Sequence, residues 1–207
     1  MCELKIRQLG IKEYGSVFAD MQEFTNKRTV KTPDEFWCVQ HPPVFTLGAN
    51  ADIKHIHTDP EIPVIKTDRG GEVTYHGPGQ AIIYLLLNLR RKSIGVKTLV
   101  QCIEQSVVDL LKAYHIKSRS QADAHGVYIE GAKIASLGLR VRSGCSYHGV
   151  ALNVNMDLKP FTLINPCGFS GLEVTQLKDH GVKANCQQIQ KELVEQLCAK
   201  LEYQIVV

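Results

Sequence analysis

A lysine and a cysteine, each set among small residues, are the side chains of this sequence best suited to nucleophilic chemistry. Lys133 lies in the segment 131–138 (GAKIASLG), and Cys167 stands between Pro166 and Gly168. A thiol attacks acyl groups as the thiolate, which a neighbouring cation favours, and a lysine can also carry the released proton. The pair therefore predicts an acyl-transfer site, provided that the two side chains, 34 positions apart, meet in the fold.

Both residues also have an ordinary interpretation. Most lysines are solvated surface charges, but the neighbours of Lys133, Ala132 and Ile134, offer an exposed ammonium nothing to bind. Near an apolar pocket, desolvation would disfavour the ammonium, so this side chain could alternate between proton donor and acceptor. An unperturbed thiol is only about a few per cent thiolate at neutral pH, so Cys167 would need such a cation beside it.

The run from Arg69 to Gln80 is a second signal for a binding site. Four glycines and a proline in twelve residues let the backbone approach a ligand closely or take positive φ angles. A tight hairpin would explain these glycines, but not the crowding of polar side chains in the same run. His76 is either a structural histidine or a pocket wall that donates to a carbonyl oxygen or orients a nucleophile. Neither the P-loop pattern nor the dinucleotide pattern G-x-G-x-x-G is present.

The remaining cysteines and histidines suggest no further chemistry. There are seven cysteines without a C-x-x-C pair, which argues against a disulfide framework and a zinc ribbon. Cys38, Cys102 and Cys198 fall in apolar or helical patterns, and we interpret them as buried small hydrophobes. His55 and His57 lack acidic or cysteine partners at metal spacing, so we expect no metal site.

Composition indicates an ordinary globular protein. The 207 residues fit one domain, which we take as residues 1–207, with 44% hydrophobic and 22% charged residues. Residues 81–87, the longest apolar stretch, are too short to span a bilayer, and the amino terminus lacks signal-peptide features, so we expect a cytoplasmic protein without membrane contact. A net charge of +3 does not support nucleic-acid binding, although it allows a local basic patch for an acidic protein partner.

Hydrophobic periodicity predicts an α+β fold. We expect helices over residues 11–27, 96–115 and 187–201, the last with Asn185 as its cap. Strands are expected over residues 4–9, 35–40, 62–66, 72–76, 80–89, 126–129, 133–141, 147–154 and 203–207. Strands outnumber helices and short turns join several of them, so we predict one domain with a mixed, mostly antiparallel sheet and helices packed outside it.

Taken together, five segments resemble one family, the octanoyltransferases of lipoate biosynthesis (LipB). They are residues 41–48 (HPPVFTLG), 69–80 (RGGEVTYHGPGQ), 131–138 (GAKIASLG), 148–154 (HGVALNV) and 165–168 (NPCG). The resemblance covers about residues 5–180. Departures are small: Glu72 stands where many members have glutamine, and Val150 where leucine is common.

The resemblance implies a fold shared with biotin and lipoate protein ligases, and an activity. Members move an octanoyl group from acyl carrier protein to a lysine of a lipoyl domain, in 2-oxoacid dehydrogenase E2 subunits or the glycine cleavage H protein. It implies Cys167 as the acyl-carrying nucleophile and Lys133 as the lysine that activates it. It also implies that three stretches bind substrate: Arg69, Gly70, Gly71, Glu72, Val73, Thr74, Tyr75 and His76; Ser136, Leu137 and Gly138; Gly149, Val150 and Ala151.

A two-step transfer follows as the expected mechanism, without metal, cofactor or ATP. Cys167 would take the octanoyl group as a thioester, and Lys133 would carry protons in both steps. An ATP-dependent lipoate or biotin protein ligase is the alternative within this fold, and a non-catalytic module that binds lipoyl domains or carrier protein is the alternative outside enzymes. Cys167 separates the transferase from the ligase, because adenylate chemistry needs no thiol nucleophile.

Overall fold

A computed structural model describes residues 3–49, 51–52, 55–56, 61–121, 124–165 and 171–205 of the chain. Most of the residues with predicted roles lie inside these ranges. Cys167, with its neighbours Pro166 and Gly168, lies outside them.

One large mixed sheet forms the centre of the molecule. Its eight strands run in the order β11 (Gln204–Ile205), β1 (Glu3–Ile11), β2 (Asp34–Gln40), β6 (Gln80–Leu86), β10 (Cys145–Asn153), β9 (Ala132–Arg142), β8 (Val127–Ile129) and β7 (Arg119–Ser120). Strand β1 is parallel to both of its neighbours, and every other pair is antiparallel. The predicted fold class, α+β with a mixed and mostly antiparallel sheet, is confirmed.

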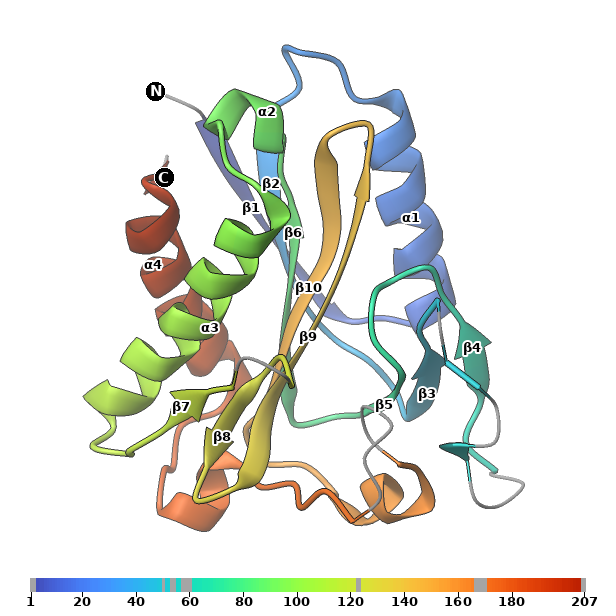
Figure 1. Cartoon of the computed structure of the whole chain (residues 1–207), viewed down its shortest axis with the longest axis vertical. Coiled ribbons are helices and arrows are strands. Elements are labelled where there is room, and N and C mark those ends of the chain that lie inside the picture. The colour runs from blue at the N-terminus through green and yellow to red at the C-terminus, as the bar shows by residue number, and fades with distance from the viewer. Residues whose placement is uncertain are drawn as a thin grey trace.

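Helices cover both faces of this sheet, and Figure 1 shows them on opposite sides of β6 and β10. Helices α3 (Val96–Ala113) and α4 (Cys186–Leu201) pack on one face, and α1 (Tyr14–Lys27) packs on the other. A short helix, α2 (Leu89–Lys92), and two 3-10 helices, Lys159–Leu163 and Leu177–His180, complete the elements. None of the described helices is long and apolar enough to cross a membrane. The expected cytoplasmic location stays a prediction.

Strand β6 explains why its sequence is apolar throughout. Ile83 and Leu85 point into the core under α3 and α4, whereas Ile82, Tyr84 and Leu86 point into the core under α1. A strand covered on both faces has no polar side, because alternate side chains enter different cores. The helix cap predicted at Asn185 is also present, with its side chain accepting a hydrogen bond from the Gln188 amide.

A second, three-stranded sheet was not predicted. Its central strand is β3 (Val44–Leu47), with β4 (Val64–Lys66) parallel on one side and β5 (Val73–His76) antiparallel on the other. The two strands expected around the Arg69 turn exist, but each pairs with β3 and not with the other. Four residues of β3 are too few to give a periodic signal, so only the long-range pairing reveals this strand.

Two predicted boundaries were wrong for a similar reason. Ile11 belongs to β1 and is 60% exposed, because the backbone continues to pair with Gln40 before helix α1 begins at Tyr14. Leu89 starts α2 instead of ending β6, since the Asn88 side chain caps that helix. Both errors arise where hydrogen bonds, and not apolar spacing, set the end of an element.

Candidate functional site

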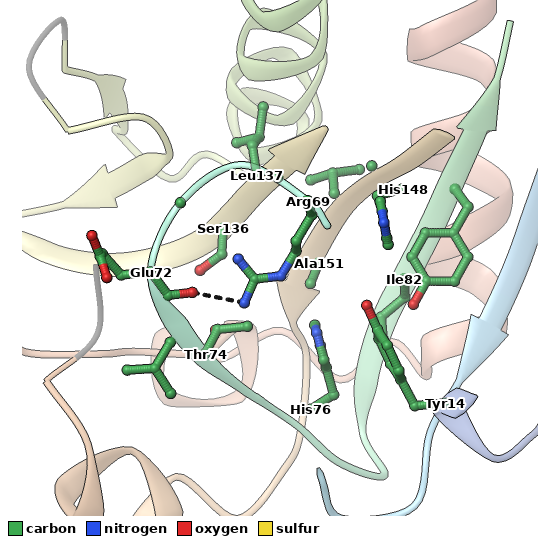
Figure 2. Close-up of a pocket in the computed structure, with 16 residues that line it drawn as sticks. Tyr14, Arg69, Glu72, Thr74, His76, Ile82, Ser136, Leu137, His148 and Ala151 are labelled. Atoms are coloured by element: carbon green, nitrogen blue, oxygen red, sulfur yellow. Dashed lines mark hydrogen bonds between the residues drawn. The ribbon is translucent and has the colours of Figure 1, made fainter. Parts of the chain in front are cut away.

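A pocket opens between the small sheet and the α1 face of the large sheet (Figure 2). It collects residues from five separate stretches of sequence. Its lining is Tyr14; Arg69, Gly71, Glu72, Val73, Thr74 and His76; Ile82 and Tyr84; Ser136, Leu137 and Gly138; His148, Gly149, Val150 and Ala151. The three stretches implied to bind substrate therefore meet in one place, although their role as substrate ligands stays a prediction.

Of the residues expected here, Gly70 and Tyr75 do not line the pocket. Successive side chains of a strand point to opposite faces, so Thr74 and His76 of β5 face the pocket and Tyr75 faces away. The Tyr75 ring packs against Phe45 and Phe161 in a separate core. Gly70 instead donates its amide hydrogen to the Leu139 carbonyl at 2.9 Å, which fastens the turn to β9.

Arg69 holds this turn in shape by binding carbonyl oxygens. Its Nη2 donates to the Thr46 carbonyl at 2.7 Å and to the Glu72 carbonyl at 2.8 Å, the bond drawn in Figure 2. Gly138 of β9 lets the turn approach, since a Cβ there would lie 2.9 Å from Arg69 Cδ and 3.0 Å from the Gly70 oxygen. The guanidinium is therefore a structural clamp at the wall of the pocket.

Small residues on β9 and β10 leave the space that forms the pocket. Ser136 pairs with Ala151, and Gly138 pairs with Gly149. Directly opposed residues share one face of a sheet, so these four small residues line the same strip of wall. The strip widens the gap between the sheet and the residues of the Arg69 turn.

Further along β10, the backbone at His148 is strained, with a φ angle of +59°. A residue with a side chain costs about 1–2 kcal/mol in this conformation, and such strain is concentrated at functional sites. Tyr147 and His148, whose rings stack at 5.0 Å, both reach the Asp68 carboxylate, and His148 Nε2 lies 2.9 Å from Asp68 Oδ1. Burial acts to raise the pKa of Asp68, but hydrogen bonds from His148, Tyr147 and Gln22 lower it overall. Asp68 is therefore ionised, and His148 Nε2 carries the hydrogen.

His76 has its ring tautomer fixed by a chain of amides. The Gln80 side chain donates from Nε2 to the Tyr75 carbonyl and to Asn153 Oδ1, so its oxygen faces His76 Nδ1 at 2.7 Å. Asn153 in turn donates to the Thr175 carbonyl at 3.0 Å. His76 Nδ1 therefore carries the hydrogen and Nε2 accepts. Burial also lowers the pKa of His76 to about 3, so the ring is neutral. Its predicted role toward a substrate carbonyl or a nucleophile stays a prediction.

We expect replacement of Gln80 by leucine to lower the free energy of unfolding by about 2–4 kcal/mol. It leaves His76 Nδ1 and Asn153 Oδ1 buried without partners, at about 1–3 kcal/mol each. Urea denaturation measures the loss, and Gln105→Leu, an exposed helix position, is the control with a change within about 0.5 kcal/mol. Equal stability of the two variants would contradict the amide chain.

Burial of three neutral histidines predicts a steep dependence of stability on pH. Burial lowers the pKa of His41 to about 4, that of His76 to about 3, and that of His148 below its ordinary value. The unfolded value is about 6.5, so the unfolded chain binds more protons below it, and this stability is present above pH about 6.5 and lost as the pH falls. His41 and His76 together should lower the free energy of unfolding by about 2 kcal/mol from pH 6 to pH 5, and His148 acts in the same direction. Urea denaturation at the two pH values checks this, with His41→Asn expected to reduce the drop by about 1 kcal/mol. A flat profile would contradict it.

Lys133 is a buried residue of β9 with 2% of its surface exposed, so the expectation that it is not a surface lysine is confirmed. Its Nζ lies 5.3 Å from the centre of the Tyr128 ring. Gly126 makes room for the side chain, since a Cβ there would lie 2.4 Å from Lys133 Cε. Lys133 does not line the pocket, but Ser136, three positions along the same strand, does.

The chain that follows Cys167 is attached directly to Lys133. The Lys133 amide donates to the Glu173 carbonyl at 2.8 Å, and the Lys133 carbonyl accepts from the Thr175 amide at 2.9 Å. Before Cys167, the Asn165 amide donates to the His55 carbonyl at 2.9 Å. A second hollow lies between these two attachments and includes Ala132, the neighbour of Lys133. Asn165 and Glu173, on either side of residues 166–170, are therefore both hydrogen-bonded to other parts of the fold.

Three cysteines inside the described ranges, Cys38, Cys186 and Cys198, are poor nucleophiles. Cys38 and Cys198 are buried as predicted, and burial raises their thiol pKa values to about 12 and about 11. Burial also raises the pKa of Cys186, to about 11. Cys102 is only partly buried, unlike the prediction, because one side of α3 meets solvent there.

Sequence reasoning missed four residues of the pocket and one beside it. Tyr14, Ile82, Tyr84 and His148 line it, and Asp68 supports His148 from behind. A tyrosine inside the apolar run of β6, and a histidine before Gly149, were the available signals. Neither could reveal that these residues meet.

Known proteins resemble this chain in sequence and in fold. A family model described as the lipoyl protein ligase A/B catalytic domain matches residues 14–198. A protein of Dechloromonas aromatica named octanoyltransferase is 53% identical over 197 residues, covering 95% of this chain and 96% of its own length. One of Nitrosococcus oceani with the same name is 52% identical, covering 97% and 89%. A solved putative lipoate protein ligase from T. acidophilum has a TM-score of 0.80 at 12% identity, covering 99% of this chain and 87% of its own, which shows the fold alone.

Proposed function

The chain belongs to the lipoyl protein ligase A/B catalytic domain family, and from this membership we propose that residues 1–207 form an octanoyltransferase of protein lipoylation. The donor is the octanoyl thioester of acyl carrier protein, and the acceptor is a lysine of a lipoyl domain. Relatives about half identical over nearly the whole chain carry the name octanoyltransferase, whereas the ligase named above resembles it only in fold.

One observation carries the proposed mechanism: buried Lys133 is hydrogen-bonded through its backbone to residues 173 and 175, just after Cys167. In the sequence, Glu173 stands six positions after Cys167. A lysine held in a low-dielectric setting beside a thiol favours the thiolate and accepts or returns a proton. We therefore assign Cys167 as nucleophile and Lys133 as the proton carrier.

In the first step the Cys167 thiolate attacks the octanoyl carbonyl. The bond to the carrier's sulfur breaks, and Lys133 protonates the thiolate that leaves. A thioester is exchanged for a thioester, so little free energy is lost. In the second step the amine of the acceptor lysine attacks the acyl-enzyme, Lys133 receives a proton from that nitrogen, and Cys167 leaves as the thiolate. The product amide is more stable than the thioester, so no nucleotide is needed.

The acyl chain occupies the pocket between β5 and β9. Its walls are mostly apolar. Burial of the acyl chain there contributes about 0.8 kcal/mol of binding free energy per methylene, or roughly 5 kcal/mol for an octanoyl group. The Arg69 clamp and the strip of Ser136, Gly138, Gly149 and Ala151 keep the walls apart for a narrow chain. In this arrangement the substrate-binding stretches contribute to acyl binding mainly by setting the width of the pocket.

A ligase would need ATP to activate free octanoate, whereas the proposed transferase needs no ATP. Purified protein, octanoyl-loaded carrier protein and a lipoyl domain should yield octanoyl-lysine without nucleotide. Free octanoate with ATP and magnesium should yield none. Mass spectrometry of the lipoyl domain reads both reactions. Product that appears only with free octanoate and ATP would overturn the proposal.

A further inference from the structure

The pocket has an open end and a closed end. Gly71 and Glu72 lie at the open end with Ser136 and Leu137, all of them partly or fully exposed. The closed end is buried and lies on the side of α1, where Figure 2 shows Tyr14, His148 and Ile82 together. Its residues are Tyr14, His76, Ile82, Tyr84 and His148. An acyl chain that enters at Ser136 must end among them.

The distance from the open end to the closed end matches the length of an octanoyl chain. Three residues of β10 separate Ala151, which pairs with Ser136, from His148. Three residues of strand span about 10 Å, which is of the order of an extended eight-carbon chain. The last atom of the chain would thus lie near the His148 ring.

His148 presents an unused hydrogen-bond acceptor at this place. Its Nε2 hydrogen goes to ionised Asp68, so Nδ1 of the neutral ring has only a lone pair. Nδ1 is buried and has no hydrogen-bond partner among the described residues, and the whole side chain is 1% exposed. Stacking on Tyr147 and contact with Phe18 hold the ring in place.

No neighbouring hydroxyl satisfies this nitrogen. The Tyr84 hydroxyl lies 2.8 Å from His41 Nε2 and donates to it, because His41 Nδ1 is occupied by the Lys12 carbonyl. The Tyr14 hydroxyl is buried and makes no hydrogen bond of normal geometry within the described part of the chain. An unpaired buried acceptor is destabilising and rare in native proteins, so its presence in a pocket points to a ligand.

We propose that the closed end is a subsite for a hydroxyl group, so that the enzyme also transfers acyl chains carrying a hydroxyl on their terminal carbon. This inference rests on the proposed function, in that it takes the pocket as the acyl site. The hydroxyl donates to His148 Nδ1. A charged group does not fit, because the closed end is buried and a charge loses its hydration there.

Three matched substrates test the subsite with the wild-type enzyme. Octanoyl, 7-hydroxyheptanoyl and 6-methoxyhexanoyl groups on the carrier protein have eight chain atoms each, but only the second has a hydrogen-bond donor. An apolar pocket without a partner should reject the hydroxyl about tenfold or more. The subsite predicts kcat/KM for 7-hydroxyheptanoyl within about tenfold of octanoyl, and at least about tenfold above 6-methoxyhexanoyl.

His148→Leu removes the acceptor, and the ratio of 7-hydroxyheptanoyl to octanoyl rates should fall about tenfold or more in this variant. The wild-type comparison stands even if the variant fails to fold. Octanoyl transfer with 7-hydroxyheptanoyl rejected more than about tenfold would overturn the subsite and leave the proposed function intact. No octanoyl transfer from carrier protein at all would overturn the proposed function instead.

Discussion

Replacing Cys167 with alanine is expected to lower the rate of octanoyl transfer by about 10³-fold or more. In the proposed mechanism the Cys167 sulfur forms the acyl-enzyme bond, whereas burial raises the thiol pKa values of Cys38, Cys186 and Cys198. The remaining pocket and Lys133 can still bind substrates, so KM should change far less than kcat. Steady-state transfer to a lipoyl domain, read by mass spectrometry, measures both.

Cys102→Ala is the matched control for this variant. Cys102 is partly exposed on α3, on the face of the sheet away from the pocket, and its sulfur donates to the Lys200 carbonyl at 3.9 Å. Its transfer rate should stay within about twofold of wild type, because Cys102 is only partly buried, packs at the edge of the core and is far from the pocket. A Cys167→Ala enzyme as active as this control would remove Cys167 from the mechanism.

Replacing Lys133 with alanine is expected to lower kcat by about 10²–10⁴-fold at neutral pH, the range typical for loss of a proton carrier. Lys133→Arg separates charge from proton transfer. Arginine keeps a cation near the thiol but does not release its proton, so thiol alkylation could survive while transfer is lost. Rates of alkylation and of transfer, measured on both variants, distinguish the two roles.

The control for Lys133 is Lys112→Ala, an exposed position in the last turn of α3. Because Lys133 is buried against Gly126 and Tyr128, its variants also need a check of folding by urea denaturation. A folded Lys133→Ala enzyme with the transfer rate of Lys112→Ala would contradict the role assigned to this lysine.

The parts of the fold that periodicity could predict are those with one continuous apolar pattern. Strand β6 and helix α3 were predicted nearly to their ends, since each buries its side chains according to its own local spacing. Strand β3 was missed because four residues carry no period. The end of β1 at Ile11 was missed because its pairing partner, Gln40, is distant in sequence.

The site, too, has residues that could be expected from the sequence and residues that only the fold brings together. The glycine-rich turn at Arg69 was expected from its residue types, and the small residues of β9 and β10 were expected from the family resemblance. The structure brings them to one pocket. The closed end could not be expected, because Tyr14, Tyr84 and His148 come from three elements whose contact is a product of the whole fold. The role of Arg69 was likewise hidden, since only the positions of the Thr46 and Glu72 carbonyls show what its guanidinium binds.

The central claim is that the octanoyl group is carried on Cys167, and mass spectrometry of the enzyme tests it most directly. Wild-type enzyme is mixed with octanoyl-loaded carrier protein, quenched in acid and digested. The account predicts one octanoyl group on the peptide that contains Cys167, which disappears on addition of a lipoyl domain as fast as octanoyl-lysine forms. Octanoyl-lysine produced at the full rate with no octanoyl group on that peptide at any time would contradict it.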